Sequence, residues 1–190
     1  MTLILLPILF VMVIYTISLY NRGINLIEAV HNNQKQIDIQ LDRRFKVFES
    51  LVDVVRKYMD FEKSTLKAIV ALRQQAVQAG KQGDMASKIA YENTISKMLG
   101  DIKVVFEQYP SLQSSQNALQ LQEEIVSTEN KLSFAKQALN DSIEIYNIYK
   151  KCFPSVLVVT YFSKKLDKTF TYWELTQEQV QTQESYTVKL

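Results

Sequence analysis

The chain has 190 residues, room for one domain and an appendage, and its four glycines and three prolines leave little material for the turns of a β-sandwich or barrel. Lysine plus arginine (22) nearly balances aspartate plus glutamate (20), which argues against a nucleic-acid-binding protein. The single histidine and cysteine, His31 and Cys152, do not favour a zinc site, a nucleophilic triad or an internal disulfide, so we expect no metal or cofactor.

The first predicted element is a membrane anchor over residues 1–21. The run from Thr2 to Tyr20 contains no charged residue, and at ~1.5 Å per residue its length approaches the ~30 Å hydrocarbon core of a bilayer. A cleaved signal peptide is the alternative, but no basic residues follow Met1, and residues 21–25 (NRGIN) lack a small-residue cleavage pattern. Arg22 and Lys35 follow the run and no Lys or Arg precedes it, so we expect the body to face the cytoplasm.

Residues 22–154 are predicted to form an all-α domain. Their apolar residues recur at steps of three and four, which is typical of long helices packed at shallow angles. The N-terminal helix should continue into an antiparallel bundle of three or four long helices, since Gly23 alone interrupts it. Seam positions include Ile37, Leu41, Arg44, Phe48 and Ile69, then Ile95 and Leu99, and finally Thr128, Leu132, Leu139, Ser142, Tyr146, Tyr149 and Phe153.

The few helix-breaking residues divide this domain. Gly80 and Gly83 bracket a turn, Asp84 is a suitable N-cap, and Phe153-Pro154 ends the last helix. If there are three bundle helices, the first would be about fifty-five residues long and would extend beyond the ends of its two shorter neighbours. Either this helix bends near Asn32-Asn33, or part of its seam is free to contact another chain.

Residues 155–190 form a tail of different character. Ser155–Phe162 is rich in β-branched and aromatic residues, an aromatic cluster follows, and the end is rich in Gln and Thr. We expect an extended strap whose rings fill a groove along the bundle. The alternative is a hook that binds a partner.

Polar residues on the apolar faces are candidate site residues. The structural interpretation is a network that sets helix register, because buried charges are tolerated when they are paired. The alternative is an enzyme with a polar site inside the bundle. The network would consist of Arg44, Glu62, Thr128, Glu129 and Asn130, and the candidate partner contacts are Asp38, Gln40, Arg43, Phe162, Phe170, Tyr172 and Trp173.

Several motifs resemble those of the bacterial LemA family, in the family's order, over about residues 20–155. They are Gln36–Arg44, Leu51-Val52, Lys57-Tyr58, Glu62-Lys63, Glu107-x-Tyr109-Pro110-x-Leu112, Leu121-Gln122-x-Glu124, Thr128–Lys131, Tyr146-Asn147 and Phe153-Pro154. Two positions depart from the family pattern: Phe61 stands where a histidine is common, and Val47–Ser50 replaces a typical Ile-Pro-Asn stretch. After Pro154 the sequence diverges, so nothing from the family is carried onto the tail.

The resemblance implies an α-helical, single-pass inner-membrane protein without known catalytic activity. Family members are often encoded beside membrane metalloproteases of the HtpX type, and one branch is associated with magnetosome membranes. We therefore expect a non-enzymatic scaffold or adaptor that acts through protein contacts in the membrane, with a second copy or an HtpX-type protease as partner. The alternatives are a lipid-binding or membrane-remodelling protein and the enzyme considered above.

Overall fold

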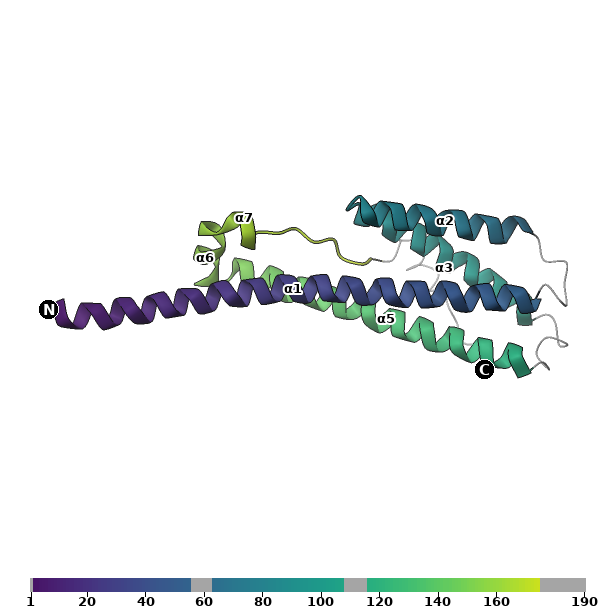
Figure 1. Cartoon of the computed structure of the whole chain (residues 1–190), viewed down its shortest axis with the longest axis horizontal. Coiled ribbons are helices and arrows are strands. Elements are labelled where there is room, and N and C mark those ends of the chain that lie inside the picture. Colours follow the sequence, from purple (N-terminus) through teal and green to yellow (C-terminus); the bar gives the residue numbers. More distant parts are fainter. Residues whose placement is uncertain (1, 56–62, 108–115, 175–190) are drawn as a thin grey trace, which may run out of the picture. The chain divides into compact units, whose positions relative to one another are not determined.

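The computed structural model describes residues 2–55, 63–107 and 116–174, and within these ranges the chain is mainly helical and contains no β-strand. The all-α class predicted from the sequence is confirmed. The helices are α1 (Thr2–Val55), α2 (Lys63–Lys81), α3 (Met85–Glu107), α5 (Gln116–Lys151), α6 (Ser155–Tyr161) and α7 (Ser163–Leu166) (Figure 1).

Helix α1 joins the apolar run to the bundle without interruption over 54 residues. It passes through Asn32-Asn33 as a helix, and the Asn33 amide donates to the carbonyl oxygen of Ala138 at 3.0 Å. Of the two predicted helix counts, the structure favours four, since the described residues form the long helices α1, α2, α3 and α5. The prediction of one first bundle helix extending to Gly80 was wrong, because α1 and α2 are separate elements. The apolar period continues in both helices, so periodicity alone did not reveal that they are two.

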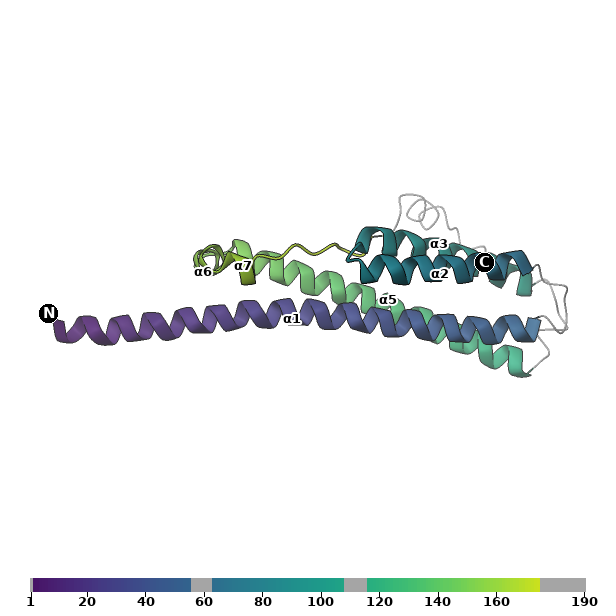
Figure 2. The same ribbon diagram turned by 45° about the horizontal axis from the view of Figure 1, so that its top comes forward.

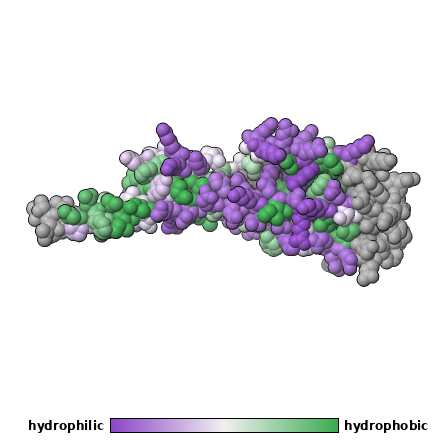
Figure 3. All heavy atoms as spheres, in the orientation of Figure 1, coloured by the Kyte–Doolittle hydropathy of each residue, from purple (hydrophilic) through white to green (hydrophobic). Residues whose placement is uncertain are grey.

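In the N-terminal part of α1, the described side chains are mostly apolar and are exposed on every side of the helix. All residues from Leu6 to Ser18 are exposed, and Figure 3 shows this stretch as a hydrophobic segment. The hydroxyl of Thr16 is satisfied within the helix, since it donates to the carbonyl oxygen of Met12 at 2.8 Å. Among the described residues, α1 is the one helix long and apolar enough to cross a membrane.

The chain groups into two compact units, and α1 and α5 contribute to both. We call residues 1–40 with 131–172 the anchor unit, and residues 41–130 with the stretch beginning at Trp173 the bundle unit. The boundaries at Gln40 and Asn130 fall inside the segment 22–154 that the sequence predicted as one domain.

In the anchor unit, two tyrosines of α5 attach other segments by hydrogen bonds to backbone atoms. The Tyr146 hydroxyl donates to the carbonyl oxygen of Leu166 at 2.6 Å and accepts from the amide of Lys168 at 2.7 Å. The Tyr149 hydroxyl donates to the carbonyl oxygen of Leu19. Burial raises the pKa of Tyr149, with a nearby Arg22 charge opposing the shift, so the phenol keeps the proton that it donates.

The predicted α5 seam is confirmed at the buried residues Thr128, Leu132, Leu139, Ser142, Tyr146 and Tyr149. At Phe153 the prediction was wrong, because this side chain is 79% exposed. Helix α5 ends at Lys151, so the helical period no longer applies two residues later.

Within the described part of the tail, residues 167–174 are not helical, whereas the extended conformation predicted from Ser155 was wrong because α6 and α7 form there. Residues 175–190 of the predicted tail lie outside the described residues. Helix α6 forms despite its β-branched composition because it buries Val158 and Val159 on one face. The Ser155 hydroxyl lies near the carbonyl oxygens of Tyr149 (2.5 Å) and Cys152 (2.9 Å), which satisfies polar backbone groups at the end of α5.

In the bundle unit, α2 and α3 form an antiparallel hairpin (Figure 2). Gly83 has a φ of 79°, the left-handed conformation that favours glycine after a helix. Asp84 caps α3 as predicted, since its carboxylate accepts the amide of Ser87 at 3.0 Å. This hydrogen bonding holds the pKa of Asp84 below its usual value.

Candidate functional site

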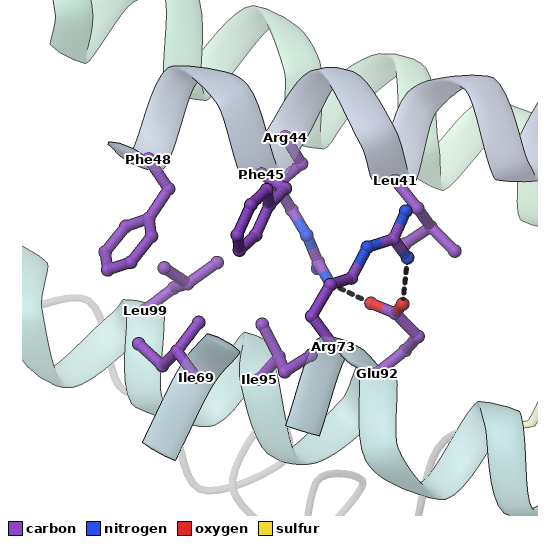
Figure 4. A pocket seen from close by; sticks show the side chains of 9 residues that line it. All are labelled: Leu41, Arg44, Phe45, Phe48, Ile69, Arg73, Glu92, Ile95 and Leu99. Atoms are coloured by element: carbon purple, nitrogen blue, oxygen red, sulfur yellow. Dashed lines mark hydrogen bonds and ion pairs between the residues drawn. The ribbon is translucent and has the colours of Figure 1, made fainter. Parts of the chain in front are cut away.

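The interior of the bundle unit contains a cluster of charged side chains from α1, α2, α3 and α5. The carboxylate of Glu92 is 2% exposed and accepts from Arg44 at 2.6 Å and from Arg73 at 2.6 Å, one guanidinium on each oxygen (Figure 4). Arg44 also lies 3.6 Å from the carboxylate of Glu129. We call Arg44, Arg73, Glu92 and Glu129, with Ser96, the charge cluster.

Helical spacing explains why charged residues meet inside this unit. Arg44 lies on the buried face of α1 between Leu41 and Phe48, both about 2% exposed or less. On α3, Glu92 precedes the buried Ile95 by three residues and therefore shares its face. Each charge is thus carried inward on a helix face that also carries buried apolar residues.

Ser96 completes the hydrogen bonding of the cluster. It accepts from Arg44 at 2.7 Å and donates to the backbone carbonyl of Glu92 at 3.0 Å. Beside these groups is a small, largely apolar pocket (Figure 4). Its lining residues are Leu41, Arg44, Phe45, Phe48, Ile69, Arg73, Glu92, Ile95 and Leu99.

The arrangement is electrically balanced, with two guanidiniums facing two carboxylates. A buried ion costs several kcal/mol of desolvation unless opposite charge and hydrogen bonds compensate it, and both are present here. Glu92 joins helices α1 and α3 through Arg44 and joins α2 to them through Arg73. The geometry therefore fixes the register of these helices. A second pair, Arg43 with Glu124, lies nearer the surface, with side chains 42% and 39% exposed.

The structure brings together only part of the predicted polar network. Arg44 and Glu129 meet, whereas Glu62 lies outside the described residues. Thr128 is fully buried, but its hydroxyl has no hydrogen-bond partner within the part of the chain that the structure describes. Asn130 faces solvent.

Sequence reasoning missed Glu92, Arg73 and Ser96, although a signal for two of them was present. Extending the α3 seam by one step before Ile95 reaches Glu92. Extending the α2 seam four residues beyond Ile69 reaches Arg73. What the sequence did not contain was the pairing, because several acids were available to a buried Arg44.

The predicted partner contacts are divided between exposed and packed positions. Asp38 and Phe162 are exposed, whereas Gln40 and Arg43 are partly buried. The other three rings pack within the chain. Phe170 lies edge-on to His31 and Tyr146 at ring-centroid distances of 5.5 and 5.4 Å, Tyr172 bonds Asn147 at 3.0 Å, and Trp173 is 5% exposed. These positions agree with a strap for Phe170–Trp173 and leave Phe162 as the exposed ring.

Fold and site together define an all-α protein with one long helix apolar enough to cross a membrane and a helical body whose buried charges pair with one another. The model of the LemA family matches residues 33–184, and the chain belongs to this family. The resemblance carried by the sequence motifs is thereby confirmed.

Two curated relatives are magnetosome proteins. Magnetosome protein MamQ of Magnetospirillum gryphiswaldense is 23% identical over 152 residues, which cover 68% of this chain and 56% of the relative. Magnetosome protein MamQ 2 of Paramagnetospirillum magneticum is 24% identical with the same coverage. The chain thus spans little more than half the length of the curated relatives it matches.

Proposed function

We propose that this protein is a non-enzymatic helical adaptor tethered in the bacterial inner membrane, with its body on the cytoplasmic side. The observation that carries the proposal is the apolar part of α1, because residues 6–18 are exposed on every face of a helix that continues directly into packed structure. A helix that exposes apolar side chains on all sides is stable in lipid and unfavourable in water.

The charge cluster supports an adaptor over an enzyme. Both of its guanidiniums pair with the buried carboxylate of Glu92, and Arg44 also lies near the partly exposed carboxylate of Glu129, which is the arrangement expected of a register-setting network. The hydroxyl of Ser96 donates to a backbone carbonyl, so it is engaged in structure as well.

Protein contacts are proposed on the exposed apolar residues of the anchor unit that lie beyond reach of the bilayer. Phe134 on α5 is 71% exposed and Ile39 on α1 is 55% exposed. Phe134 lies fifteen residues before Tyr149, about 22 Å along the helix at ~1.5 Å per residue. A partner anchored in the same membrane would meet this surface at high effective concentration. We propose a second copy of the chain, or a membrane protease of the HtpX type, as that partner.

Photo-crosslinking in bacterial membranes tests the proposal. A photoreactive amino acid at position 134 or 39 should give a discrete adduct, whereas the same residue at Val77, which is 39% exposed on α2, should give none. The adduct mass distinguishes a second copy from another membrane protein. Phe134→Asp should abolish the adduct formed from position 39. Equal labelling at all three positions would contradict the proposed surface.

A fractionation experiment tests the tether separately. The full chain should resist alkaline carbonate extraction, and a chain lacking residues 2–20 should appear in the soluble fraction. Full extraction of the intact chain by carbonate would contradict the proposal.

A further inference from the structure

Helix α6 presents an exposed apolar face. Leu157 and Tyr161 are four residues apart, so they lie on the same side of the helix, and their side chains are 61% and 82% exposed. Phe153, in the turn before α6, is 79% exposed. Val158 and Val159 are buried, so α6 presents apolar side chains both to the interior and to its exposed side.

The segment that contains α6 and α7 lies beside the turn of α1 where the uncharged run ends. The ring of Phe162 contacts the ring of Tyr20 edge-on at a centroid distance of 5.0 Å, and Tyr149 bonds the carbonyl oxygen of Leu19. Leu166 of α7 packs against Gly23, where an added Cβ would lie 3.0 Å from its side chain. Figures 1 and 2 both show α6 and α7 alongside α1. If α1 crosses a bilayer with this run, α6 lies at the membrane surface.

Lysines flank α6 on both sides in the sequence. The segment from Ile145 to Lys168 contains five lysines and one acid, Asp167. Lys150 pairs with Asp167 at 3.2 Å, so the segment's one carboxylate is already occupied. The remaining lysines are exposed, and they are Lys151, Lys164, Lys165 and Lys168.

We propose that α6 and α7 form a second membrane contact, in which the Leu157 and Tyr161 face of α6 enters the headgroup region and the lysines bind anionic phospholipids. Aromatic and aliphatic side chains flanked by lysines are the composition of interfacial helices, and basic residues beside a membrane span attract anionic lipid. The inference rests on the proposed function, because only insertion of α1 brings α6 to the bilayer.

The charge distribution favours lipid over a second copy of this chain as the occupant. Two such faces brought together would place lysines of both copies side by side, and like charges in close contact repel. An anionic headgroup layer offers the opposite charge over the same area. Helix α6 also lies next to the end of the exposed apolar run of α1, so a single bilayer would cover both apolar surfaces.

The native cysteine provides the probe for a test. Cys152 is the only cysteine of the chain and is exposed beside Phe153, so an environment-sensitive fluorophore can be attached there without substitution. The labelled full chain is reconstituted in vesicles of phosphatidylcholine, with or without phosphatidylglycerol. Quenching by lipid carrying a nitroxide high on its acyl chain is compared with quenching by aqueous iodide.

We expect strong lipid quenching and weak iodide quenching, with larger lipid quenching when phosphatidylglycerol is present. The double variant Leu157→Asp, Tyr161→Asp should reduce lipid quenching several-fold, and Lys164→Glu with Lys165→Glu should remove the dependence on phosphatidylglycerol. Val77→Asp is the matched control and should leave both signals unchanged, since it places a charge on an exposed apolar position of the bundle unit.

Three results would overturn the inference. The first is iodide quenching that is equal with and without lipid. The second is lipid quenching that the double aspartate variant leaves unchanged. The third is a label that neither quencher reaches, with a degree of shielding that depends on the protein-to-lipid ratio. The third result would assign the face to a second copy. Resistance of the chain in the same vesicles to carbonate extraction is measured in parallel. A chain that resists extraction while its label is exposed to water contradicts this inference alone. A chain that carbonate extracts contradicts the proposed function. Circular dichroism of each variant checks that the helices are retained.

Discussion

The two units hold their helices together by different kinds of polar contact. In the bundle unit, the central links are ion pairs, with Glu92 shared by Arg44 and Arg73. In the anchor unit, the links made by Tyr146 and Tyr149 are neutral hydrogen bonds between phenol hydroxyls and backbone atoms. Neutral links suit the unit beside the bilayer, since the cost of burying an ion rises as the surroundings become less polar.

The largest expected effect comes from breaking the ionic link of the bundle unit. Glu92→Ala should lower the free energy of unfolding of this unit by about 3–5 kcal/mol, because it leaves two guanidiniums facing the interior without their shared carboxylate. Denaturant unfolding of the full chain in detergent, followed with a probe in α3, measures this. The matched control is Glu124→Ala, whose half-exposed pair with Arg43 should contribute less than about 1 kcal/mol. Equal losses for the two variants would contradict the distinction.

The corresponding change in the anchor unit is smaller. Tyr146→Phe should cost about 1–3 kcal/mol, since it leaves the carbonyl of Leu166 and the amide of Lys168 without the hydroxyl that bonds both. Faster amide hydrogen exchange in residues 163–170, with α2 and α3 unchanged, would show that the effect is local. Tyr161→Phe, at an 82% exposed position, is the control and should change stability little.

A pair of glycines sharpens the comparison further. Gly100→Ala should stabilise α3 by about 0.5–1 kcal/mol, because an alanine Cβ there meets nothing within 4 Å and glycine is a poor helix former. Gly23→Leu should instead displace Leu166 and Tyr149, which already approach an ideal Cβ at 3.0 and 3.2 Å. Thermal unfolding of both variants gives the signs. A stabilising Gly23→Leu would show that α7 does not pack on this turn.

The smallest effect concerns pH and the cap of α3. The folded-state pKa of Asp84 lies below its ordinary value of 3.8, so the ionised cap stabilises the helix fully above that value, and the contribution is lost as the pH falls through the lowered folded-state pKa. Asp84→Asn keeps a capping oxygen without a titrating group. The melting temperature of the variant should therefore depend less on pH below 4 than that of the parent. Identical pH profiles would remove the assigned role of the carboxylate.

The sequence predicted those features that depend on local pattern or on composition. Helical class, the run of α1 through Gly23, the turn at Gly83 and the cap at Asp84 all follow from periodicity and from single-residue preferences. The inward position of Arg44 followed in the same way, from its place on an apolar seam.

What the sequence did not predict depends on contacts between distant segments. The choice of Glu92 as partner of Arg44 requires knowing how α3 is aligned with α1, and helix periodicity leaves that alignment open. Helix α6 forms because tertiary burial of Val158 and Val159 outweighs the strand preference of its residues. The division between α1 and α2 was likewise concealed, because the apolar period continues in both helices.

The contact of Tyr149 with Leu19 has a consequence for rotation of the anchor. The last turn of the uncharged run is held by a phenol from α5 on one carbonyl and by the Leu166 side chain against Gly23. Helix α1 is therefore not free to spin about its own axis within the anchor unit. If α1 crosses the bilayer as proposed, each of its residues keeps a fixed orientation relative to the adjoining part of α5, so a neighbouring membrane protein always meets the same side of the anchor unit.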